Sequence, residues 1–463
     1  MTVTATPTPP TAIDERTASA PTNERSTPKS RIGRIVIGSI LGGLITAVLL
    51  ITVVVAGARE HVITGSVLLA FAAAWAALAV LSERRTDQPQ RWARVPAVVM
   101  AAAGTAILAL APTGNQAGWI WPPVIFAMAV WMTVQARRSL RSRTRVWVLY
   151  PVFAALLLSA VGGAYETYRE ANDPTVGAMP GRLVDVGSYK LHINCTGTGS
   201  PTVVLEPGLG EVSPMMSAWI APEVAHDTRV CVYDRAGRGW SESADHPQNG
   251  EQIATDLHTL LQRAGETGPF VLAGHSAGGI YALNFAKLFP QDVAGVVLLD
   301  SMHPEQYQRI PSWRGFYEMF RRATGVMPSL ARLGVGRVVY DNQFGDLPQP
   351  QRSQESAFVA TPRHQRSIRD EFSQIRASLN QAAELHTLGS IPLEVLTAGH
   401  QDYAEWFSLQ DDLARLSTNS VHRTLPDASH DMIPADENTA HQSSQAILDV
   451  VNAVRTGAPI AKG

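Results

Sequence analysis

The sequence predicts an α/β domain with a mostly parallel sheet, preceded by an all-α transmembrane region of about five helices. Two observations support this fold class. Over residues 175–463, apolar runs of strand length alternate with segments that have helical spacing of apolar residues. Over residues 32–165, five runs of about 18–23 residues contain no Asp, Glu, Lys or Arg. Alternation of this kind predicts a parallel sheet that helices cover on both faces.

The first 31 residues are rich in Thr, Pro, Ala and Ser. Such a segment cannot bury enough apolar surface to order itself, so we expect residues 1–31 to be disordered. An apolar run begins only at Ile35, which argues against a signal peptide. The C-terminal half has no basic patch interleaved with aromatic residues, so nucleic acid is not an expected partner.

Each of the five apolar runs is long enough to cross about 30 Å of hydrocarbon at roughly 1.5 Å per residue. One such run could be a buried helix of a soluble domain, but five in succession favour a membrane. The third run is the weakest, because it is short and contains Pro96 and Gly104. The predicted spans cover residues 35–57, 61–82, 95–112, 117–136 and 146–164.

Arginines cluster before the first run and in the second and fourth loops, whereas the first loop has only Arg59 and Glu60. Positive loops stay cytoplasmic, so the pattern predicts a cell-membrane protein with a cytoplasmic N-terminus. Five crossings would then place everything after residue 165 outside the cytoplasm. Both cysteines, Cys195 and Cys231, lie in that part, where a pair is a candidate disulfide. Two unrelated buried thiols are the alternative.

In the globular half, apolar runs rich in β-branched residues predict strands, and apolar residues at helical spacing predict helices. The expected strands cover residues 182–186, 189–194, 202–206, 229–233, 269–273, 293–299, 393–397 and 421–425. The expected helices between and after them cover residues 252–263, 280–289, 406–416 and 437–455.

A G-x-S-x-G motif, Gly274-His275-Ser276-Ala277-Gly278, lies between one of these strands and a helix. That context is typical of a sharp turn that exposes the serine at the top of a sheet. The flanking glycines are needed because a Cβ there would clash with the neighbouring strand and helix. Ser276 is therefore a candidate nucleophile.

Four pieces of the chain together resemble the α/β-hydrolase family. They are residues 205–210 (Leu-Glu-Pro-Gly-Leu-Gly), residues 233–241, the G-x-S-x-G motif, and a C-terminal acid and histidine. The resemblance covers roughly residues 180–455. It implies a mostly parallel eight-stranded sheet in a domain spanning residues 175–463, with a helical cap inserted at about 301–389. It also places Cys195 and Cys231 on neighbouring strands, within reach of a disulfide.

A serine hydroxyl needs a histidine base, and that base needs a carboxylate to orient it. The resemblance implies the chain order serine, acid, histidine. His430, between the last strand and the last helix, matches the family's histidine. Asp402, after the seventh strand, matches the usual acid. Asp300, at the end of the sixth strand, is the alternative acid, or else a cap on the chain that enters the insertion.

The resemblance assigns the oxyanion hole to the backbone N–H groups of Leu209 and Ala277. Glu206-Pro207 stands where a histidine is usual, so Glu206 is either a structural hydrogen-bond partner, which we favour, or a carboxylate near the acyl site. The loop that begins Asp234-Arg235 is interpreted as structural. A serine at the turn argues against haloalkane dehalogenases and epoxide hydrolases, which carry aspartate there.

The chain has no H-E-x-x-H motif and no Cys/His cluster at ligand spacing, so neither a metal nor a cofactor is expected. The expected function is a membrane-anchored, lipase-like serine esterase. Its partners would be a small-molecule or lipid-like ester and the lipid bilayer, and the oligomeric state stays open. Alternatives are acyl transfer to a cell-envelope acceptor and a non-catalytic membrane receptor. A transporter is less favoured, because the spans lack internal ionisable residues.

Overall fold

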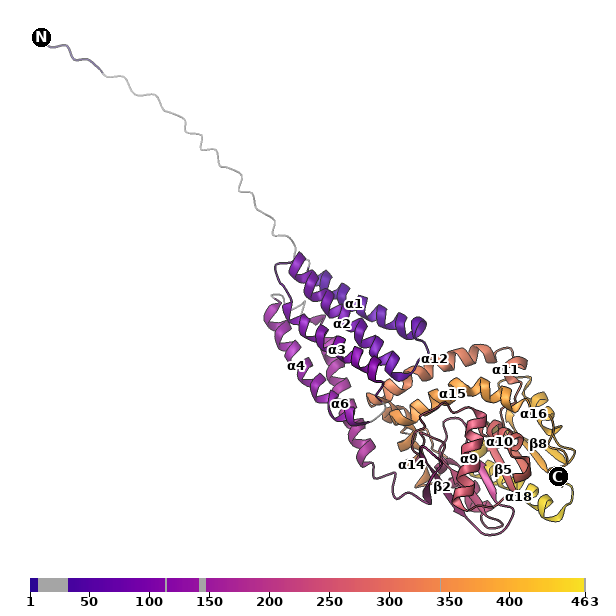
Figure 1. Cartoon of the computed structure of the whole chain (residues 1–463). Helices are drawn as coiled ribbons and strands as arrows, with labels where there is room; N and C mark the ends of the chain where they lie inside the picture. Colours follow the sequence, from indigo (N-terminus) through magenta and orange to yellow (C-terminus); the bar gives the residue numbers. More distant parts are fainter. Residues whose placement is uncertain (7–31, 113–114, 141–146, 342, 462–463) are drawn as a thin grey trace.

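The computed structural model describes residues 1–6, 32–112, 115–140, 147–341 and 343–461. A bundle of long helices is followed by an α/β domain, and the bundle's first helix begins at the end farthest from that domain (Figure 1). Two expectations lie outside the described residues: disorder over residues 7–31, and the position of the fourth-loop arginines Arg141, Arg143 and Arg145.

Four stretches of the bundle are long and apolar enough to cross a membrane: Ile32–Val54, Glu60–Arg85, Arg91–Leu110 and Ala117–Ser139. They contain α1 (Ile32–Leu49) with the π-helical turn η1 (Leu50–Val54), α2 (Glu60–Arg85), η2 (Arg91–Ala93) with α3 (Arg94–Leu110), and η3 (Asn115–Trp119) with α4 (Trp121–Ser139).

The fifth predicted span forms α6 (Tyr150–Asn172), which packs along α4 (Figure 1). This helix is not among the four stretches named above. Within the described residues, four helices are therefore long and apolar enough to cross a membrane, where five were predicted. Its last third carries Glu166, Arg169 and Glu170, and these charged residues extend beyond the apolar run that the sequence shows.

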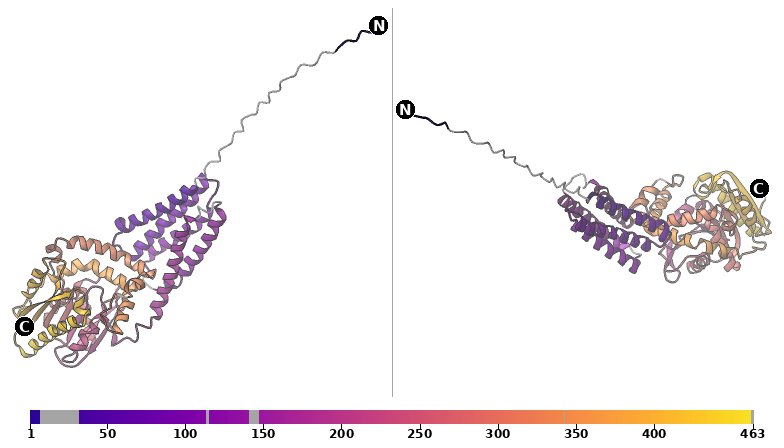
Figure 2. Two further views of the ribbon diagram at one scale, coloured as in Figure 1. Left: turned by 180° about the vertical axis from the view of Figure 1, so that it is seen from behind. Right: turned by 90° about the horizontal axis from the view of Figure 1, so that it is seen from above.

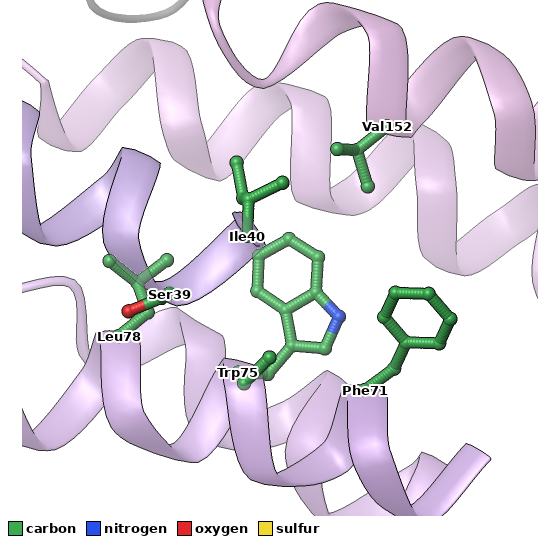
Figure 3. A pocket seen from close by; sticks show the side chains of 7 residues that line it. Ser39, Ile40, Phe71, Trp75, Leu78 and Val152 are labelled. Atoms are coloured by element: carbon green, nitrogen blue, oxygen red, sulfur yellow. The ribbon is translucent and has the colours of Figure 1, made fainter. Parts of the chain in front are cut away.

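The bundle has an apolar core of its own. Between α1, α2 and α6 lies a small cavity of about 30 Å³, in which the Trp75 indole takes the central position (Figure 3). Trp75 also packs 5.8 Å from Trp92, measured between ring centroids. A cavity this small, lined almost wholly by apolar side chains, is a packing defect of the helices. Its lining residues are Ser39, Ile40, Phe71, Ala74, Trp75, Leu78 and Val152.

The α/β domain is built on one eight-stranded sheet in the order β1-β2-β4-β3-β5-β6-β7-β8. The β1–β2 and β2–β4 pairs are antiparallel and all other pairs are parallel. The strands are β1 (Arg182–Asp185), β2 (Lys190–Thr196), β3 (Val203–Glu206), β4 (Val230–Tyr233), β5 (Phe270–His275), β6 (Val293–Leu299), β7 (Leu393–His400) and β8 (Ser420–Ser429).

Cys195 of β2 lies directly opposite Cys231 of β4, and the two sulfurs are bonded. At the other edge, β8 continues to Ser429, four residues beyond the predicted end of the strand. His430 therefore follows the strand directly.

Helices cover both faces of the sheet. Along β5, Leu272 packs with α9 (Gly250–Ala264) and α10 (Ala277–Leu288), whereas Val271 and Ala273 pack on the opposite face with α18 (Glu437–Thr456). This alternation follows from the two-residue period of a strand. Smaller helices complete the domain: α7 (Ser213–Ala218), α8 (Ile220–Val224), η4 (Pro290–Asp292), α16 (Trp406–Ala414) and α17 (Met432–Ala435).

The insertion after β6 forms a helical cap on the side of the domain that adjoins the bundle (Figure 2). Ion pairs join the cap to the bundle. Glu60, at the start of α2, accepts hydrogen bonds from Arg332 (2.7 Å) and Arg366 (3.1 Å) of the cap. Arg337 of the cap pairs with Glu166 of α6. The cap helices are α11 (Gln306–Arg309), α12 (Trp313–Arg332), α13 (Val335–Tyr340), α14 (Gln351–Val359) and α15 (Pro362–Ala382).

Candidate active site

Ser276 occupies the turn between β5 and α10 in a strained conformation, with φ 55° and ψ −120°. A positive φ is costly for a residue with a Cβ, so the surroundings must hold it. The Ser276 N–H donates to the carbonyl of Leu299 (3.1 Å), and the N–H of Met302 donates to the carbonyl of Ser276 (3.0 Å). Both partners belong to the end of the neighbouring strand β6 and the segment that follows it.

The two glycines of the motif are required by close backbone contacts. A Cβ on Gly278 would lie 2.2 Å from the carbonyl oxygen of Glu206, and one on Gly274 would lie 2.5 Å from the backbone of Gly278. The start of α10 therefore packs directly on the end of β3. This contact brings Ala277 next to the loop that contains Leu209.

His430 is oriented by Asp300, because its Nδ1 lies 2.6 Å from an Asp300 carboxylate oxygen. Asp300 is fully buried and also accepts hydrogen bonds from the Trp406 indole (2.9 Å) and the Gln401 amide (3.0 Å). Burial alone would raise the pKa of Asp300, but the hydrogen bond and charge of His430 hold that pKa below its ordinary value. Asp300 is therefore an ionised carboxylate. It binds the Nδ1 atom of His430, so the Nε2 atom is not engaged by Asp300.

The structure brings the alternative acid, Asp300, to His430, whereas Asp402, the favoured acid, does not pair with His430. Asp402 lies in the bend after β7 with an exposed side chain. The neighbouring residue Gln401 takes the inward position and donates to Asp300. Gln401 is partly buried whereas Asp402 is exposed, so the chain after β7 turns Gln401 toward Asp300 and Asp402 toward solvent.

The oxyanion loop, residues 207–210, is held by two buried arginines. Arg235 donates to the carbonyls of Pro207 (2.6 Å) and Gly208 (2.7 Å), and Arg238 also donates to the Gly208 carbonyl (3.2 Å). A trans peptide is planar, so fixing the Gly208 carbonyl points the N–H of Leu209 in the opposite direction.

Within the described residues, neither the Leu209 N–H nor the Ala277 N–H has a hydrogen-bond partner. Ala277 is fully buried, and Leu209 is partly exposed. Ala277 is the first residue of α10, where an N–H group has no partner within the helix, so both donors are available to a ligand oxygen. The role of Leu209 and Ala277 as oxyanion donors stays a prediction.

A cap residue completes the arginine cluster. Glu371 of α15 forms ion pairs with Arg235 (3.1 Å) and Arg238 (2.6 Å), and accepts a hydrogen bond from the Tyr281 hydroxyl (2.9 Å). Burial alone would raise the pKa of Glu371, but the two arginines hold that pKa below its ordinary value. The sequence does not indicate the roles of Arg238 and Glu371, because Glu371 lies more than 130 residues along the chain from either arginine.

Glu206 has the structural role that the sequence favoured. Its carboxylate accepts a hydrogen bond from the Tyr233 hydroxyl (2.6 Å) and is fully buried. Burial raises its pKa to about 7, against the opposing effect of the Arg235 charge. The Asp234-Arg235 loop is likewise structural, and through Arg235 it also shapes the oxyanion loop.

Two further side chains touch this constellation and were not predicted. The Nδ1 atom of His275 lies 2.6 Å from a Glu211 carboxylate oxygen, and its Nε2 atom lies 3.2 Å from the backbone carbonyl of His430. The two histidine rings are 4.7 Å apart between centroids. His275 lies inside the G-x-S-x-G motif, but only folding brings Glu211 to it.

A metal would have to use His, Cys, Asp or Glu side chains. In the part of the chain that the structure describes, one group is close enough to share an ion: Cys195, Cys231 and Glu266. Its two sulfurs are bonded to each other and are not available as thiolate ligands.

Comparisons with known proteins agree with this architecture. Residues 203–442 match the Alpha/beta hydrolase family. An uncharacterized protein of Schizosaccharomyces pombe is 26% identical over 301 residues, which cover 56% of this chain and 54% of that protein. An uncharacterized vacuolar membrane protein of Saccharomyces cerevisiae is 25% identical over 201 residues, covering 38% of this chain and 30% of that protein. This chain thus spans about half the length, or less, of these relatives.

Among solved structures, the Cif epoxide hydrolase from Acinetobacter nosocomialis superposes with a TM-score of 0.51 at 16% identity, covering 62% of this chain and 96% of that chain. At this identity the likeness concerns the fold alone. The family match covers more than half of the chain, and the sheet order and the serine turn agree with it. The chain therefore belongs to the alpha/beta hydrolase family.

Proposed function

We propose that the chain is a membrane-anchored serine hydrolase that cleaves carboxylic esters with apolar acyl groups. The observation that carries this proposal is the 2.6 Å hydrogen bond between His430 and the buried, ionised Asp300. It gives the serine turn a base with a defined tautomer, because an ionised carboxylate holds the proton on Nδ1 and leaves Nε2 as the acceptor.

The reaction begins when the Nε2 atom of His430 takes the proton of the Ser276 hydroxyl and Ser276 Oγ attacks the ester carbonyl. The N–H groups of Leu209 and Ala277 stabilise the resulting oxyanion. The tetrahedral intermediate expels the alcohol, which receives the proton from His430. Water then attacks the acyl-enzyme and loses a proton to His430. The second tetrahedral intermediate releases the carboxylic acid as His430 returns that proton to Ser276 Oγ.

The identity of the nucleophile favours an ester over an epoxide. Epoxide hydrolases of this family carry an aspartate at the position of Ser276, so the fold likeness to one of them does not extend to this atom. Apolar residues of the cap pack on the loop after β7, which also carries the Asp300 partner Gln401, and this supports an apolar acyl group. Trp313 and Phe316 of α12 pack together, and Trp313 packs against Tyr403 of the loop after β7.

We also propose that the bundle spans the cell membrane with the α/β domain outside the cytoplasm. Glu60 contacts the cap, so the other end of α2, with Arg84 and Arg85, lies at the far end of the bundle. The start of α1 lies at that same far end (Figure 1). Positive residues favour the cytoplasmic side, and the disulfide between Cys195 and Cys231 favours an oxidising compartment for the other side.

Labelling with a fluorophosphonate tests the proposed chemistry on the full-length chain in detergent. The reagent should modify Ser276 and abolish hydrolysis of p-nitrophenyl esters, and Ser276→Ala should show neither labelling nor activity. Ser373→Ala, on the cap helix α15, is the matched control and should behave like the wild type. A folded wild-type chain that is neither labelled nor active would overturn the proposal.

A further inference from the structure

Glu211 connects the two loops on which the proposed reaction depends. One of its carboxylate oxygens accepts the N–H of Gly208, in the oxyanion loop, through a short hydrogen bond. The other carboxylate oxygen lies 2.6 Å from Nδ1 of His275. His275 in turn reaches the backbone carbonyl of His430 through Nε2 (3.2 Å). A continuous chain of hydrogen bonds therefore runs from the oxyanion loop to the base.

The partners of His275 define its protonation state. A backbone carbonyl can only accept, so Nε2 of His275 must carry a proton. An ionised carboxylate can also only accept, so Nδ1 must carry a proton as well. Both conditions together make His275 an imidazolium, provided that Glu211 is ionised.

The surroundings favour that pair of charges. Burial alone would raise the pKa of Glu211, but the charge of His275 and the hydrogen bonds from His275 and Gly208 hold that pKa below its ordinary value. Burial alone would lower the pKa of His275, but the charge of Glu211 and the hydrogen bond to it raise that pKa. His275 is only 2% exposed, so its charge is shielded from solvent.

We propose that Glu211 and a doubly protonated His275 are positioning residues, which lock the backbone of His430 to the oxyanion loop. This inference rests on the proposed function, because it assigns a role toward the same base and oxyanion donors. Neither residue touches the ester. Their effect is to hold the imidazole of His430 and the N–H of Leu209 in one rigid arrangement around Ser276.

The geometry of Gly208 supports the same role. A Cβ at this position would lie 2.9–3.1 Å from the carboxylate of Glu211, which is tighter than ordinary contact. The oxyanion loop thus follows the Glu211 carboxylate as closely as a glycine allows, while Arg235 holds the carbonyl side of the same loop.

Removing the Glu211 charge tests the proposal, with Glu211→Gln as the variant. Its amide oxygen can still accept from one neighbour, but His275 no longer needs a proton on Nδ1. Other charged and titratable groups also act on the pair and must be kept intact: Asp300, His430, Glu355 and Arg238.

In full-length protein, kcat for p-nitrophenyl ester hydrolysis should fall about 10- to 100-fold, with KM changed by less than about twofold. The alkaline limb of the kcat profile should move to lower pH by about 1–3 units, because His275 loses its counter-charge. A purely structural role would not move this limb. Glu384→Gln, the same substitution at an exposed cap residue, should leave both quantities unchanged.

Two conservative changes at His275 separate its contacts. His275→Gln keeps a donor near the position of Nε2 and should retain more activity than His275→Phe, which keeps none. If Glu211→Gln and His275→Phe have the kcat and pH profile of the wild type, the proposal is wrong. An inactive wild-type chain would instead contradict the proposed hydrolase function, so the two failures can be told apart.

A spectroscopic measurement covers the case in which these variants do not fold. Nitrogen NMR of the wild-type chain labelled with ¹⁵N-histidine should show one buried imidazole with both nitrogens protonated near neutral pH. The signal is assigned to His275 by its coupling across the hydrogen bond to the His430 carbonyl, which requires no variant. A His275 ring with a single proton would overturn the proposal.

Discussion

Asp300 and His430 are 130 residues apart in the chain, and a carboxylate oxygen of the first lies 2.6 Å from Nδ1 of the second. The pair forms because β6 ends beside β7, and β7 ends beside β8. Asp300 has φ 40°, so its backbone leaves the strand in a turn. Its side chain is held by Trp406 and Gln401 as well as by His430.

Replacing each candidate acid by asparagine in turn tests whether Asp300 is the acid that orients His430. Asp300→Asn should lower kcat by about 10³- to 10⁴-fold, because an amide can stabilise the wrong tautomer of His430 and cannot balance its charge. Asp402→Asn, at the residue directly after the Asp300 partner Gln401, should stay within about twofold of the wild type. Steady-state kinetics on one ester measures both. The opposite ranking would restore Asp402 as the acid.

The several N–H donors of the Arg235 guanidinium should support the oxyanion loop more than the positive charge of Arg235 does. In Arg235→Lys the charge remains, but a single ammonium cannot bond the carbonyls of Pro207 and Gly208 together with Glu371. We expect kcat to fall about 10- to 100-fold, less than the complete loss of an oxyanion donor would cost. Arg263→Lys, at an exposed arginine of α9, serves as the control. Equal activity of both variants would show that the loop does not depend on Arg235.

Glu206 should make the stability of the α/β domain depend on pH. Burial raises its folded-state pKa to about 7 from an ordinary 4.5. A raised pKa contributes stability that is fully present below the unfolded value of 4.5 and is lost as pH rises through 7. Glu206→Gln removes this titration. Relative to wild type, the variant should gain up to about 3 kcal/mol between about pH 4.5 and about pH 8.

Thermal unfolding followed by tryptophan fluorescence at several pH values measures the Glu206 effect. Glu266→Gln is a suitable comparison, because Glu266 lies in the same domain and pairs with the partly exposed Arg229. Parallel pH curves for Glu206→Gln and the wild type would contradict the assignment of a raised pKa to Glu206.

Glu60 should hold the cap against the bundle. Glu60→Gln weakens the hydrogen bonds from both Arg332 and Arg366, each of which is worth roughly 1.5–3 kcal/mol when charged groups are involved. Amide hydrogen exchange in the C-terminal turns of α12 should become faster in the variant. Glu83→Gln, at the opposite end of the same helix, is the control, since Glu83 pairs with Arg91 and Arg94 away from the cap. Exchange rates that respond equally to both changes would argue against a local clamp.

The disulfide between Cys195 and Cys231 should stabilise the edge of the sheet. It closes a loop with a sequence separation of 36 residues, for which roughly 4 kcal/mol is expected. Alkylation of the native chain should label neither cysteine until a reductant is added, and reduction should lower the melting temperature. Cys195→Ser/Cys231→Ser should match the reduced wild type. Full alkylation of chain taken directly from the membrane, without reductant, would also argue against an oxidising location.

The chain's own periodicities were sufficient for much of the fold. The predicted strand ranges overlap all eight strands, and the signal is plainest in β4 and β6, whose apolar residues are covered on both faces of the sheet. The strand, turn and helix around Ser276 could also be predicted, because they are contiguous in the chain. Gly274 and Gly278 are required there by close backbone contacts.

The sequence predicts the partners of Ser276 less well than the motif itself, for a physical reason. Whether Asp300 or Asp402 meets His430 depends on how far β7 extends and which way the following side chains point, and Gln401 takes the inward place. Glu211, His275, Arg238 and Glu371 acquire their roles only through contacts between distant segments. Local patterns specify the elements, whereas the polar contacts of a site depend on orientations that only packing of the whole sheet and cap sets.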